Sequence, residues 1–436
     1  MSLPGPFTED FKSTPYWWEA AEPTPVQAPD LPTNIDVAVV GGGYTGLSCA
    51  LELARQGVKV AVVEAERIGF QASSRNGGMV TGGLKLAQGA MSSQLGQDRA
   101  AAILKEAIGT LDFIEMLIER EGIACHFRRT GRFTCAYSRR DYDALAARTD
   151  QIAELTGGAA YMLPPSRQRE EIGSDHYRGG MVVKASGALH PSLYLRGLAT
   201  AAARAGATLI DGTRATGFER QANGWRIKTE RGDITARDVM VGTNGYTGPA
   251  TPWLRRRVVP VASFIIATEE LPADLTKRLV PNGRMLADTR RVLSYFRLSP
   301  DGKRVLWGGR VGTSAMEARK SALRLRAMMC RVWPELADAR LTHSWNGNVA
   351  FTFDYLPHLG VHNGMHYAMG CQGNGVAMQT WLGYQAALMI AGGKNAPSAF
   401  SGLPFPTKPL YNGAPWFLPA VLAWYKLRDS IDRLSS

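Results

Sequence analysis

Three glycines near the start of the chain have the spacing of a dinucleotide-binding turn. Gly41, Gly43 and Gly46 form a G-x-G-x-x-G motif directly after a short apolar run that predicts a buried parallel strand. The first glycine permits a tight bend, the second lets the backbone approach a pyrophosphate, and the third lets the next helix pack closely on the strand. A second strand, predicted at 58–63, ends on Glu64, whose carboxylate is suited to bind a ribose hydroxyl and would repel a 2′-phosphate. This order of elements indicates a dinucleotide site that disfavours NADP but does not separate NAD from FAD.

Three further stretches combine glycine with polar side chains. Residues 64–78 form a loop whose backbone can approach a flat ligand, while its hydroxyl and guanidinium groups can meet phosphate or ribityl oxygens. The run 239–245 predicts a buried strand that ends in a turn. Residues 370–376 form a second glycine cluster, followed by a mostly apolar helix. Such a turn points backbone N–H groups and the positive end of the helix dipole at whatever lies ahead.

The polar loop carries a resemblance that is more specific than the glycine motif. Its run 67–78 reads Arg-Ile-Gly-Phe-Gln-Ala-Ser-Ser-Arg-Asn-Gly-Gly. With 41–47 and 64–69, it resembles the amine and amino-acid oxidases of the D-amino-acid oxidase type, and most of all the bacterial γ-glutamylputrescine oxidoreductase group. The resemblance implies FAD as the cofactor. It implies that FAD contacts Gly41, Gly43, Tyr44, Thr45, Gly46, Glu64, Ala65, Arg67, Ser73, Ser74, Arg75, Asn76, Gly77, Gly78, Thr243, Asn244, Gly245, Gly370, Gly373, Asn374, Gly375 and Val376.

The resemblance also implies the fold class and the domain organisation. We expect an α/β fold with a Rossmann-like FAD-binding domain of the D-amino-acid oxidase type and an antiparallel-sheet substrate domain. Strands predicted at 258–268, 292–298 and 304–307 would form that sheet as a wall over the flavin. The expected division is an irregular N-terminal arm at 1–31, the FAD-binding domain at 32–90, 168–255 and 341–400, the substrate domain at 91–167 and 256–340, and a tail with an amphipathic helix at 401–436. We expect Trp17 and Trp18 to hold the arm on the folded body, and the segment 345–360 to be rich in loops.

By the same resemblance, the reaction is the oxidation of a primary or secondary amine, with a γ-glutamylated polyamine as one candidate. Hydride passes from the carbon beside a neutral amine to flavin N5, and the resulting imine is hydrolysed, with oxygen as the acceptor. The alternative is a dehydrogenase of a D- or N-methyl amino acid that passes electrons to a carrier. Related amino-acid oxidases can carry a carboxylate-binding lysine where this chain has Ala377, so a long amine with a distant polar end is favoured. The wall residues expected to act on the substrate are Tyr295, Arg297 and Trp345, with Arg297 as a carboxylate clamp or a surface arginine.

Two positions qualify what the resemblance implies about the flavin. Asn374 stands where the family often has histidine, which puts a protonatable role there in doubt. Some sarcosine-oxidising relatives attach the flavin to a cysteine shortly before a Thr-x-Asp segment, here 352–354. The preceding residues 345–351 contain no cysteine, so we expect non-covalent FAD, with Cys371 as the competing thiol.

Composition and charge limit the kinds of partner and the cellular compartment that the protein can have. The 436 residues carry a net charge of +12, but arginine is spread along the chain, which favours a basic solvated surface over nucleic-acid binding. Five scattered cysteines without a C-x-x-C motif predict free thiols in the cytoplasm. Neither a secretory signal nor a membrane span is expected.

The tail helix can pack on the body or dock on a membrane surface or a partner. His358, His362 and His366 could share a helix face and hold a metal, but the glycines between them favour a turn, so we expect no metal.

Overall fold

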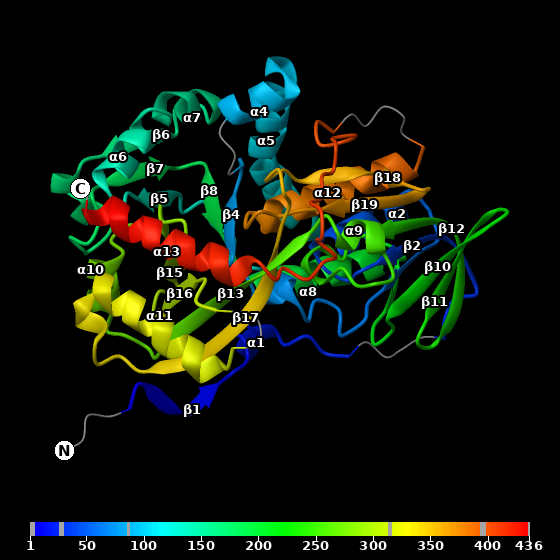
Figure 1. The fold of residues 1–436 in the computed structure, drawn as a ribbon. Coiled ribbons are helices and arrows are strands. Elements are labelled where there is room, and N and C mark those ends of the chain that lie inside the picture. Colours follow the sequence, from blue (N-terminus) through cyan, green and yellow to red (C-terminus); the bar gives the residue numbers. More distant parts are fainter. Residues whose placement is uncertain (1–4, 26–29, 85–87, 313–315, 393–397, 435–436) are drawn as a thin grey trace.

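Two large β-sheets dominate the computed structural model, which describes residues 5–25, 30–84, 88–312, 316–392 and 398–434. Figure 1 shows one sheet with its helices on the right and the other sheet on the left. The eight-stranded sheet has a parallel centre, because the apolar strands next to the first glycine turn are covered on both faces. In spatial order it contains β10 (Ala215–Gln221), β11 (Gly224–Thr229), β12 (Gly232–Val241), β2 (Asn34–Val40), β3 (Val60–Val63) and β9 (Thr208–Ile210), with β18 (His358–His362) and β19 (Met365–Met369) attached to β12.

The nine-stranded sheet is mostly antiparallel and carries most of the predicted wall strands. The strands expected at 258–268, 292–298 and 304–307 are confirmed as neighbouring members of it. In spatial order it contains β1 (Phe7–Lys12), β17 (Leu341–Phe351), β13 (Val259–Thr268), β16 (Val305–Gly309), β15 (Ser294–Leu298), β14 (Met285–Asp288), β5 (Arg132–Cys135), β7 (Gly180–Val183) and β6 (Ala160–Leu163). A separate two-stranded ribbon joins β4 (Met79–Thr81) to β8 (Ser186–Ala188).

Helices cover both sheets. One apolar core lies between the eight-stranded sheet and α2, α5, α8 and α12, while α11 packs on the other sheet. The helices are α1 (Trp18–Ala21), α2 (Tyr44–Arg55), α3 (Ala72–Arg75), α4 (Gln88–Leu95), α5 (Gln97–Glu121), α6 (Arg139–Ala146), α7 (Thr149–Leu155), α8 (Pro191–Arg204), α9 (Pro252–Arg255), α10 (Ala273–Leu279), α11 (Ala318–Val332), α12 (Gly375–Ile390) and α13 (Leu418–Leu434). Short 3₁₀ turns are η1 (Pro165–Glu170), η2 (Asn244–Tyr246) and η3 (Pro334–Leu336).

Strand pairing differs from the expected domain boundaries at two places. The segment 341–351, assigned to the FAD-binding domain and expected to be partly loop, is the long strand β17, paired with β13 throughout its length. Likewise β7 belongs to the nine-stranded sheet although 168–255 was assigned to the other domain. Pairing between strands that are far apart in the sequence determines which sheet β17 and β7 join. The local sequence pattern does not show this pairing. The division into two domains itself stays a prediction.

The N-terminal arm is attached as expected but is less irregular. Its tryptophans are buried, with Trp17 fully covered, as the sequence predicted for residues that hold the arm on the body. Residues 7–12 form β1, which pairs in parallel with β17, so the expectation of a wholly irregular arm is wrong. The arm therefore joins the edge of the nine-stranded sheet.

The tail forms the predicted amphipathic helix, α13, which lies across the nine-stranded sheet in Figure 1. Its Asp429 carboxylate accepts hydrogen bonds from Arg291 N at 3.1 Å and Val292 N at 3.2 Å, which fixes one face of the helix. Trp424, Leu427 and Ile431 on another face are about half exposed. Packing on the body is thus confirmed for one face, and docking of the other stays a prediction. In the described parts of the chain, no helix has the length and hydropathy needed to cross a bilayer.

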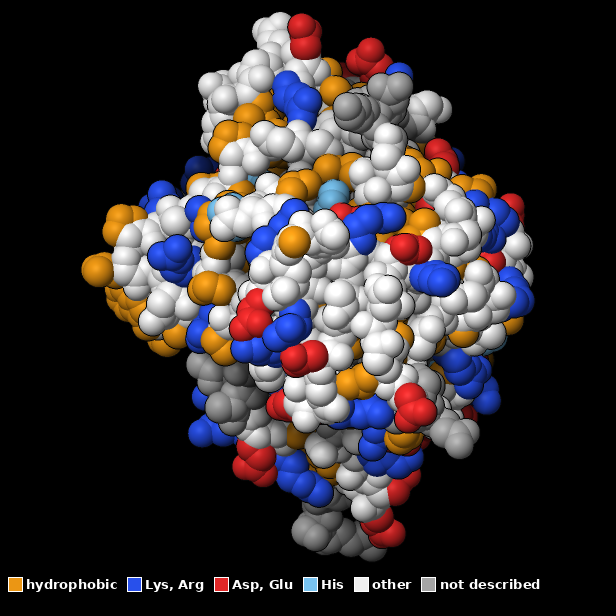
Figure 2. All heavy atoms as spheres, turned by 90° about the vertical axis from the view of Figure 1, so that its right-hand side faces the viewer, with side chains coloured by type: hydrophobic (Ala, Val, Ile, Leu, Met, Phe, Trp, Pro, Cys, Tyr) orange, Lys and Arg blue, Asp and Glu red, His pale blue; other side chains and the backbone are white. Residues whose placement is uncertain are grey.

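Basic side chains are interspersed with acidic ones on the side of the molecule shown in Figure 2. Lys228 pairs with Glu219 at 2.5 Å on the exposed strands β10 and β11, and Arg226 approaches Asp233 at 3.9 Å. On this side the excess of positive charge is therefore distributed, as the sequence indicated.

Candidate functional site

The first glycine turn joins β2 to α2 with the geometry that the sequence predicted. Gly41 has a φ of +108°, which glycine adopts without strain. A Cβ on Gly46 would lie 1.9 Å from Gly41 O, so only glycine lets α2 start this close to the end of β2. Gly41, Gly43, Tyr44 and Thr45 line a large cavity at this turn, and Gly46 supports it from behind.

Glu64 stands at the end of β3 and lines the same cavity together with Ala65. Its Oε2 accepts a hydrogen bond from Gly42 N at 2.6 Å, and its Oε1 accepts one from Glu66 N at 3.0 Å. Burial raises the pKa of Glu64, while these backbone donors oppose the rise. The carboxylate is thus fixed at the cavity wall, and its remaining lone pairs can accept hydrogen bonds from ligand hydroxyls.

Arg67 lies on the same loop but faces away from the cavity. Its Nη1 donates to Glu22 Oε1 at 3.1 Å and to Pro23 O at 3.0 Å. These contacts tie the loop to the N-terminal arm. The expected contact between Arg67 and the cofactor stays a prediction.

The short helix α3 divides the polar loop into lining and supporting residues. Ser74 is fully buried and its Oγ accepts a hydrogen bond from Trp18 Nε1 at 3.0 Å, so its side chain supports the loop and its expected cofactor contact stays a prediction. Gly78 is also a supporting residue, because a Cβ there would lie 2.2 Å from Leu189 O. Of the residues from α3 onward that were expected to contact FAD, Ser73, Arg75, Asn76 and Gly77 line the cavity, and Gln71 and Ala72 line it as well.

Two of the three expected substrate residues instead support this loop. Arg297 is 7% exposed, and its Nη1 donates to Gly78 O at 3.0 Å and Leu189 O at 2.9 Å. Trp345 is 2% exposed, and its Nε1 donates to Arg75 O at 2.7 Å. Neither side chain is among the residues that line the cavity, and each holds the loop through its carbonyl groups. Their expected contact with the substrate stays a prediction.

The turn after β12 closes another side of the cavity. Thr243, Asn244 and Gly245 line it, and their expected contact with FAD stays a prediction. Asn244 Oδ1 also accepts a hydrogen bond from Gly370 N at 3.0 Å, which connects this turn to the second glycine cluster.

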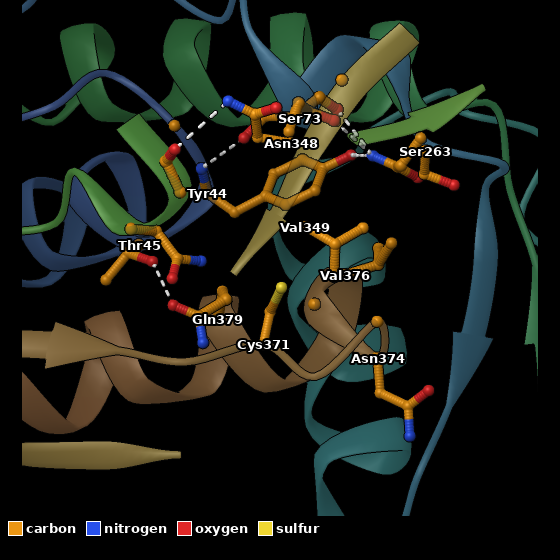
Figure 3. A pocket seen from close by; sticks show the side chains of 18 of the residues that line it. Tyr44, Thr45, Ser73, Ser263, Asn348, Val349, Cys371, Asn374, Val376 and Gln379 are labelled. Atoms are coloured by element: carbon orange, nitrogen blue, oxygen red, sulfur yellow. Dashed lines mark hydrogen bonds between the residues drawn. The ribbon is translucent and has the colours of Figure 1, made fainter. Parts of the chain in front are cut away.

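The second glycine cluster leads into α12 as the sequence predicted. Gly373, Asn374, Gly375 and Val376 line the cavity, so the positive end of α12 faces it. Gly370 lies behind the wall with a φ of +85°. Figure 3 shows the labelled Cys371, Asn374 and Val376 on one side of the cavity, across from Ser73, Asn348 and Ser263. Thr45 Oγ1 donates to Gln379 Oε1 at 2.9 Å, which joins the two helix starts (Figure 3).

The cavity, of about 930 Å³, continues from these turns across the nine-stranded sheet. Four of its lining residues form a cross-strand row on β15, β14, β5 and β7. Tyr295, the third expected substrate residue, begins the row, and its hydroxyl lies 2.9 Å from Ser263 Oγ. In order, the row is Tyr295, Ala287, Thr134 and Met181.

Sequence reasoning did not select four arginines that line the cavity: Arg132, Arg148, Arg214 and Arg310. Arg310 follows β16, close enough to Tyr295 for their charges to interact, and burial lowers its pKa. Its guanidinium carbon lies 4.7 Å from the centre of the Phe351 ring. Arg132 on β5 and Arg148 before α7 lie in the part farther along the sheet. No local motif marks these positions, because the cavity wall is assembled by strand pairing.

These residues fit FAD. The cavity volume lies in the upper range of cofactor sites. A Cβ on Gly43 would lie 2.8 Å from Ser73 Oγ, so the absence of a side chain at this glycine keeps the wall open. Two helix starts, those of α2 and α12, present positive dipole ends, which suits a diphosphate and a flavin that becomes negative on reduction.

The histidine triplet does not share a helix face. His358 and His362 are the first and last residues of β18, and His366 follows the turn on β19. Among the described residues, no cluster of histidine, cysteine and acidic side chains has the arrangement of a metal site.

Comparison with known proteins agrees with this geometry. The family model described as "FAD dependent oxidoreductase" (DAO) matches residues 36–389. A protein of Rhizobium meliloti (strain 1021) named "Probable oxidoreductase OrdL" is 33% identical over 426 residues, covering 95% of this chain and 97% of the relative. The gamma-glutamylputrescine oxidoreductase of Escherichia coli (strain K12) is 30% identical over 401 residues, covering 91% and 93%.

The fold has a close solved counterpart. The crystal structure of glycine oxidase from Geobacillus kaustophilus matches with a TM-score of 0.72 and 22% identity, over 86% of this chain and 99% of that chain. The predicted fold class and FAD as the cofactor are thereby confirmed. The absence of a covalent link stays a prediction.

Proposed function

Because this chain belongs to the FAD-dependent oxidoreductases of the DAO family, we propose that it oxidises a primary or secondary amine whose other end is polar. The observation that carries the proposal is the extension of the cavity past Tyr295 to Thr134 and Met181 on the nine-stranded sheet. A small amino acid would leave this part unfilled, whereas a γ-glutamylated polyamine would use it. The relative named for γ-glutamylputrescine supports the same substrate class.

The chain would position both partners of the reaction. Bound FAD supplies the hydride acceptor for the carbon beside the amine. The start of α12 would hold the flavin, and its dipole would stabilise the negative charge of the reduced ring. Tyr295 and Ser263, joined by their hydroxyl hydrogen bond, face the cavity from the sheet and would orient the amine. No charged base is required, because the substrate amine reacts in its neutral form.

An anaerobic screen of amines tests the proposal through bleaching of the flavin band. We expect γ-glutamylputrescine and similar long amines to reduce the flavin, and reoxidation in air to yield hydrogen peroxide if oxygen is the acceptor. Reduced flavin that reoxidises only with an added carrier would indicate a dehydrogenase. Failure of every amine to bleach the flavin would refute amine oxidation and favour a protein in which FAD is structural.

The rate of flavin reduction should rise with pH, because only the neutral amine yields hydride readily. A free alkylamine titrates at about pH 10, so stopped-flow rates at low substrate concentration should increase across the range of about pH 6 to 10. A flat profile would contradict amine oxidation.

A second candidate is the oxidation of a D- or N-methyl amino acid. Arg310 favours it, since this partly buried arginine lies beside Tyr295 and could bind a carboxylate next to the reacting carbon. The same screen separates the two candidates: flavin bleached by D-amino acids or sarcosine, but not by long amines, selects the second.

We propose a cytoplasmic location for either activity. The support is the presence of five cysteines that are all free thiols.

A further inference from the structure

The outer end of the cavity contains two arginines, Arg132 and Arg148, here called the outer arginine pair. Arg132 is the first residue of β5, and Arg148 is the residue before α7. Both line the cavity, with Arg148 exposed at its rim and Arg132 farther inside. Burial lowers the pKa of both guanidinium groups, and the neighbouring charge of Arg148 lowers the pKa of Arg132 further.

The charge of this pair is not balanced within the described parts of the chain. No Asp or Glu oxygen there lies within 4.0 Å of either guanidinium, in contrast to paired arginines on the surface such as Arg167, Arg169 and Arg278. The Arg132 Nε is buried and has no hydrogen-bond partner among the described residues. Asp288 also lines the cavity, but both of its carboxylate oxygens already accept hydrogen bonds from other groups. Its Oδ2 accepts a hydrogen bond from Arg290 Nε at 2.7 Å, and its Oδ1 accepts one from Ser294 N at 3.0 Å. Two like charges with an unused buried donor indicate a site for an external anion.

Strand register gives the distance of this site from Tyr295. Tyr295 pairs with Ala287, which pairs with Thr134, so β5 is two strands from β15. Arg132 lies two residues before Thr134 on β5. Two strand spacings of about 4.8 Å and two residues of about 3.3 Å place the Cα atoms of Tyr295 and Arg132 about 12 Å apart. An extended chain of about three to four residues spans this distance.

The wall between these ends is largely apolar. Met181 and Val183 on β7 and Ile152 and Leu155 on α7 line it. Methylene groups of a flexible chain would pack against them, and the planar guanidinium groups match a carboxylate, which can accept two parallel hydrogen bonds.

We propose that the outer arginine pair binds a carboxylate at the end of the substrate opposite to the amine that is oxidised. This proposal rests on the proposed amine oxidation and names its substrate class: long amines with a terminal carboxylate. It differs from the role of Arg310, which lies beside Tyr295 at the inner end.

The test compares γ-glutamylputrescine, whose distal end carries a carboxylate and an α-ammonium group, with N-acetylputrescine, whose distal end carries neither. Loss of a charge-assisted hydrogen bond should lower kcat/KM for γ-glutamylputrescine about 10- to 100-fold in Arg132→Gln and change N-acetylputrescine by less than about threefold. Arg148→Gln, at the exposed rim, should show a smaller loss with the same selectivity. Arg167→Gln is the matched control, because Arg167 is an exposed arginine paired with Glu170 outside the cavity.

Binding of γ-glutamylethylamide, which keeps the carboxylate but lacks the reacting amine, gives a readout independent of turnover. Calorimetry of the FAD-loaded protein should show about 10-fold or greater weakening in Arg132→Gln. Equal losses for both amines, or unchanged binding and kinetics in Arg132→Gln, would overturn the proposal. If no amine bleaches the flavin but γ-glutamylethylamide binding depends on Arg132, the anion site stands and amine oxidation fails. If Arg132→Gln does not retain FAD, the same comparison in Arg148→Gln tests whether the outer arginine pair binds the carboxylate.

Discussion

Replacing Arg297 by methionine tests whether this arginine supports the cofactor loop or binds substrate. Methionine has a similar length but no N–H donors. Arg297 donates to Gly78 O at 3.0 Å and to Leu189 O at 2.9 Å, so the variant removes these two short hydrogen bonds between distant segments. It also removes a longer bond to Gly77 O at 3.4 Å and a local bond to Leu298 O at 3.0 Å. Hydrogen bonds from a charged donor contribute about 1.5–3 kcal/mol each, which gives a gross loss of about 3–6 kcal/mol for the two short bonds between distant segments.

Part of this loss is offset. Burial lowers the pKa of Arg297 to about 10, which corresponds to a cost of about 3 kcal/mol for keeping its charge in the protein. Gly78 O also keeps a second donor, Leu189 N at 2.9 Å. The net destabilisation is therefore at most about 3 kcal/mol, which a folded protein of this size can survive.

The remaining effect should appear in FAD binding, because Gly77, next to the anchored Gly78, lines the cavity. We expect Arg297→Met to weaken FAD binding about 10- to 100-fold, measured by fluorescence titration of the apoprotein. With FAD saturating, the ratio of kcat/KM for carboxylated and neutral amines should stay within about twofold of the parent ratio. A ratio that falls about 10-fold, with FAD affinity unchanged, would refute this reasoning and restore Arg297 as a carboxylate clamp.

Three other changes test the cofactor site. Glu64→Ala should weaken FAD binding about 10- to 100-fold through loss of a charged acceptor, and equal retention of FAD would contradict ribose binding. Gly46→Ala should prevent stable folding, since its Cβ would lie 1.9 Å from Gly41 O, whereas Gly109→Ala in the exposed face of α5, with no atom within 4 Å, should be neutral or raise the melting temperature. Acid precipitation should release the flavin into the supernatant, and a yellow pellet that becomes colourless only in Cys371→Ser would show a covalent link.

The cofactor turn was predictable because its signals are local. A positive φ at Gly41 and the close approach at Gly46 are properties of one strand, one turn and one helix, and all three lie within a short segment. Glu64 follows from the same pattern, as the end of the next parallel strand. Sequence spacing suffices where neighbours in space are also neighbours in the chain.

The sequence could not separate the residues that support the cavity wall from those that line it, because this distinction depends on contacts between distant parts of the chain. Ser74 turns away because Trp18, 56 residues earlier, donates to its hydroxyl. Arg297 lies on the same strand face as Tyr295 but meets carbonyl groups of the loop more than 100 residues away. Only the tertiary arrangement determines whether an arginine on this face meets a ligand or the backbone.

The arginines of the cavity also explain how substrate length can determine specificity. Arg310 lies beside Tyr295, and Arg132 lies two strands farther along the same sheet, so an anion meets a different cation according to its distance from the reacting carbon. A carboxylate next to that carbon would reach Arg310 and leave the outer pair unbalanced. A carboxylate at the far end of a long amine would do the reverse, and Arg310 would then face the neutral part of the chain. An unpaired charge in a partly desolvated wall costs free energy. Binding of each substrate is therefore favoured by the arginine that its carboxylate neutralises and disfavoured by the arginine that it leaves without a counter-ion. The ratio of kcat/KM between short amino acids and long carboxylated amines should therefore move in opposite directions in Arg310→Met and Arg132→Gln, and parallel changes would refute two separate cation positions.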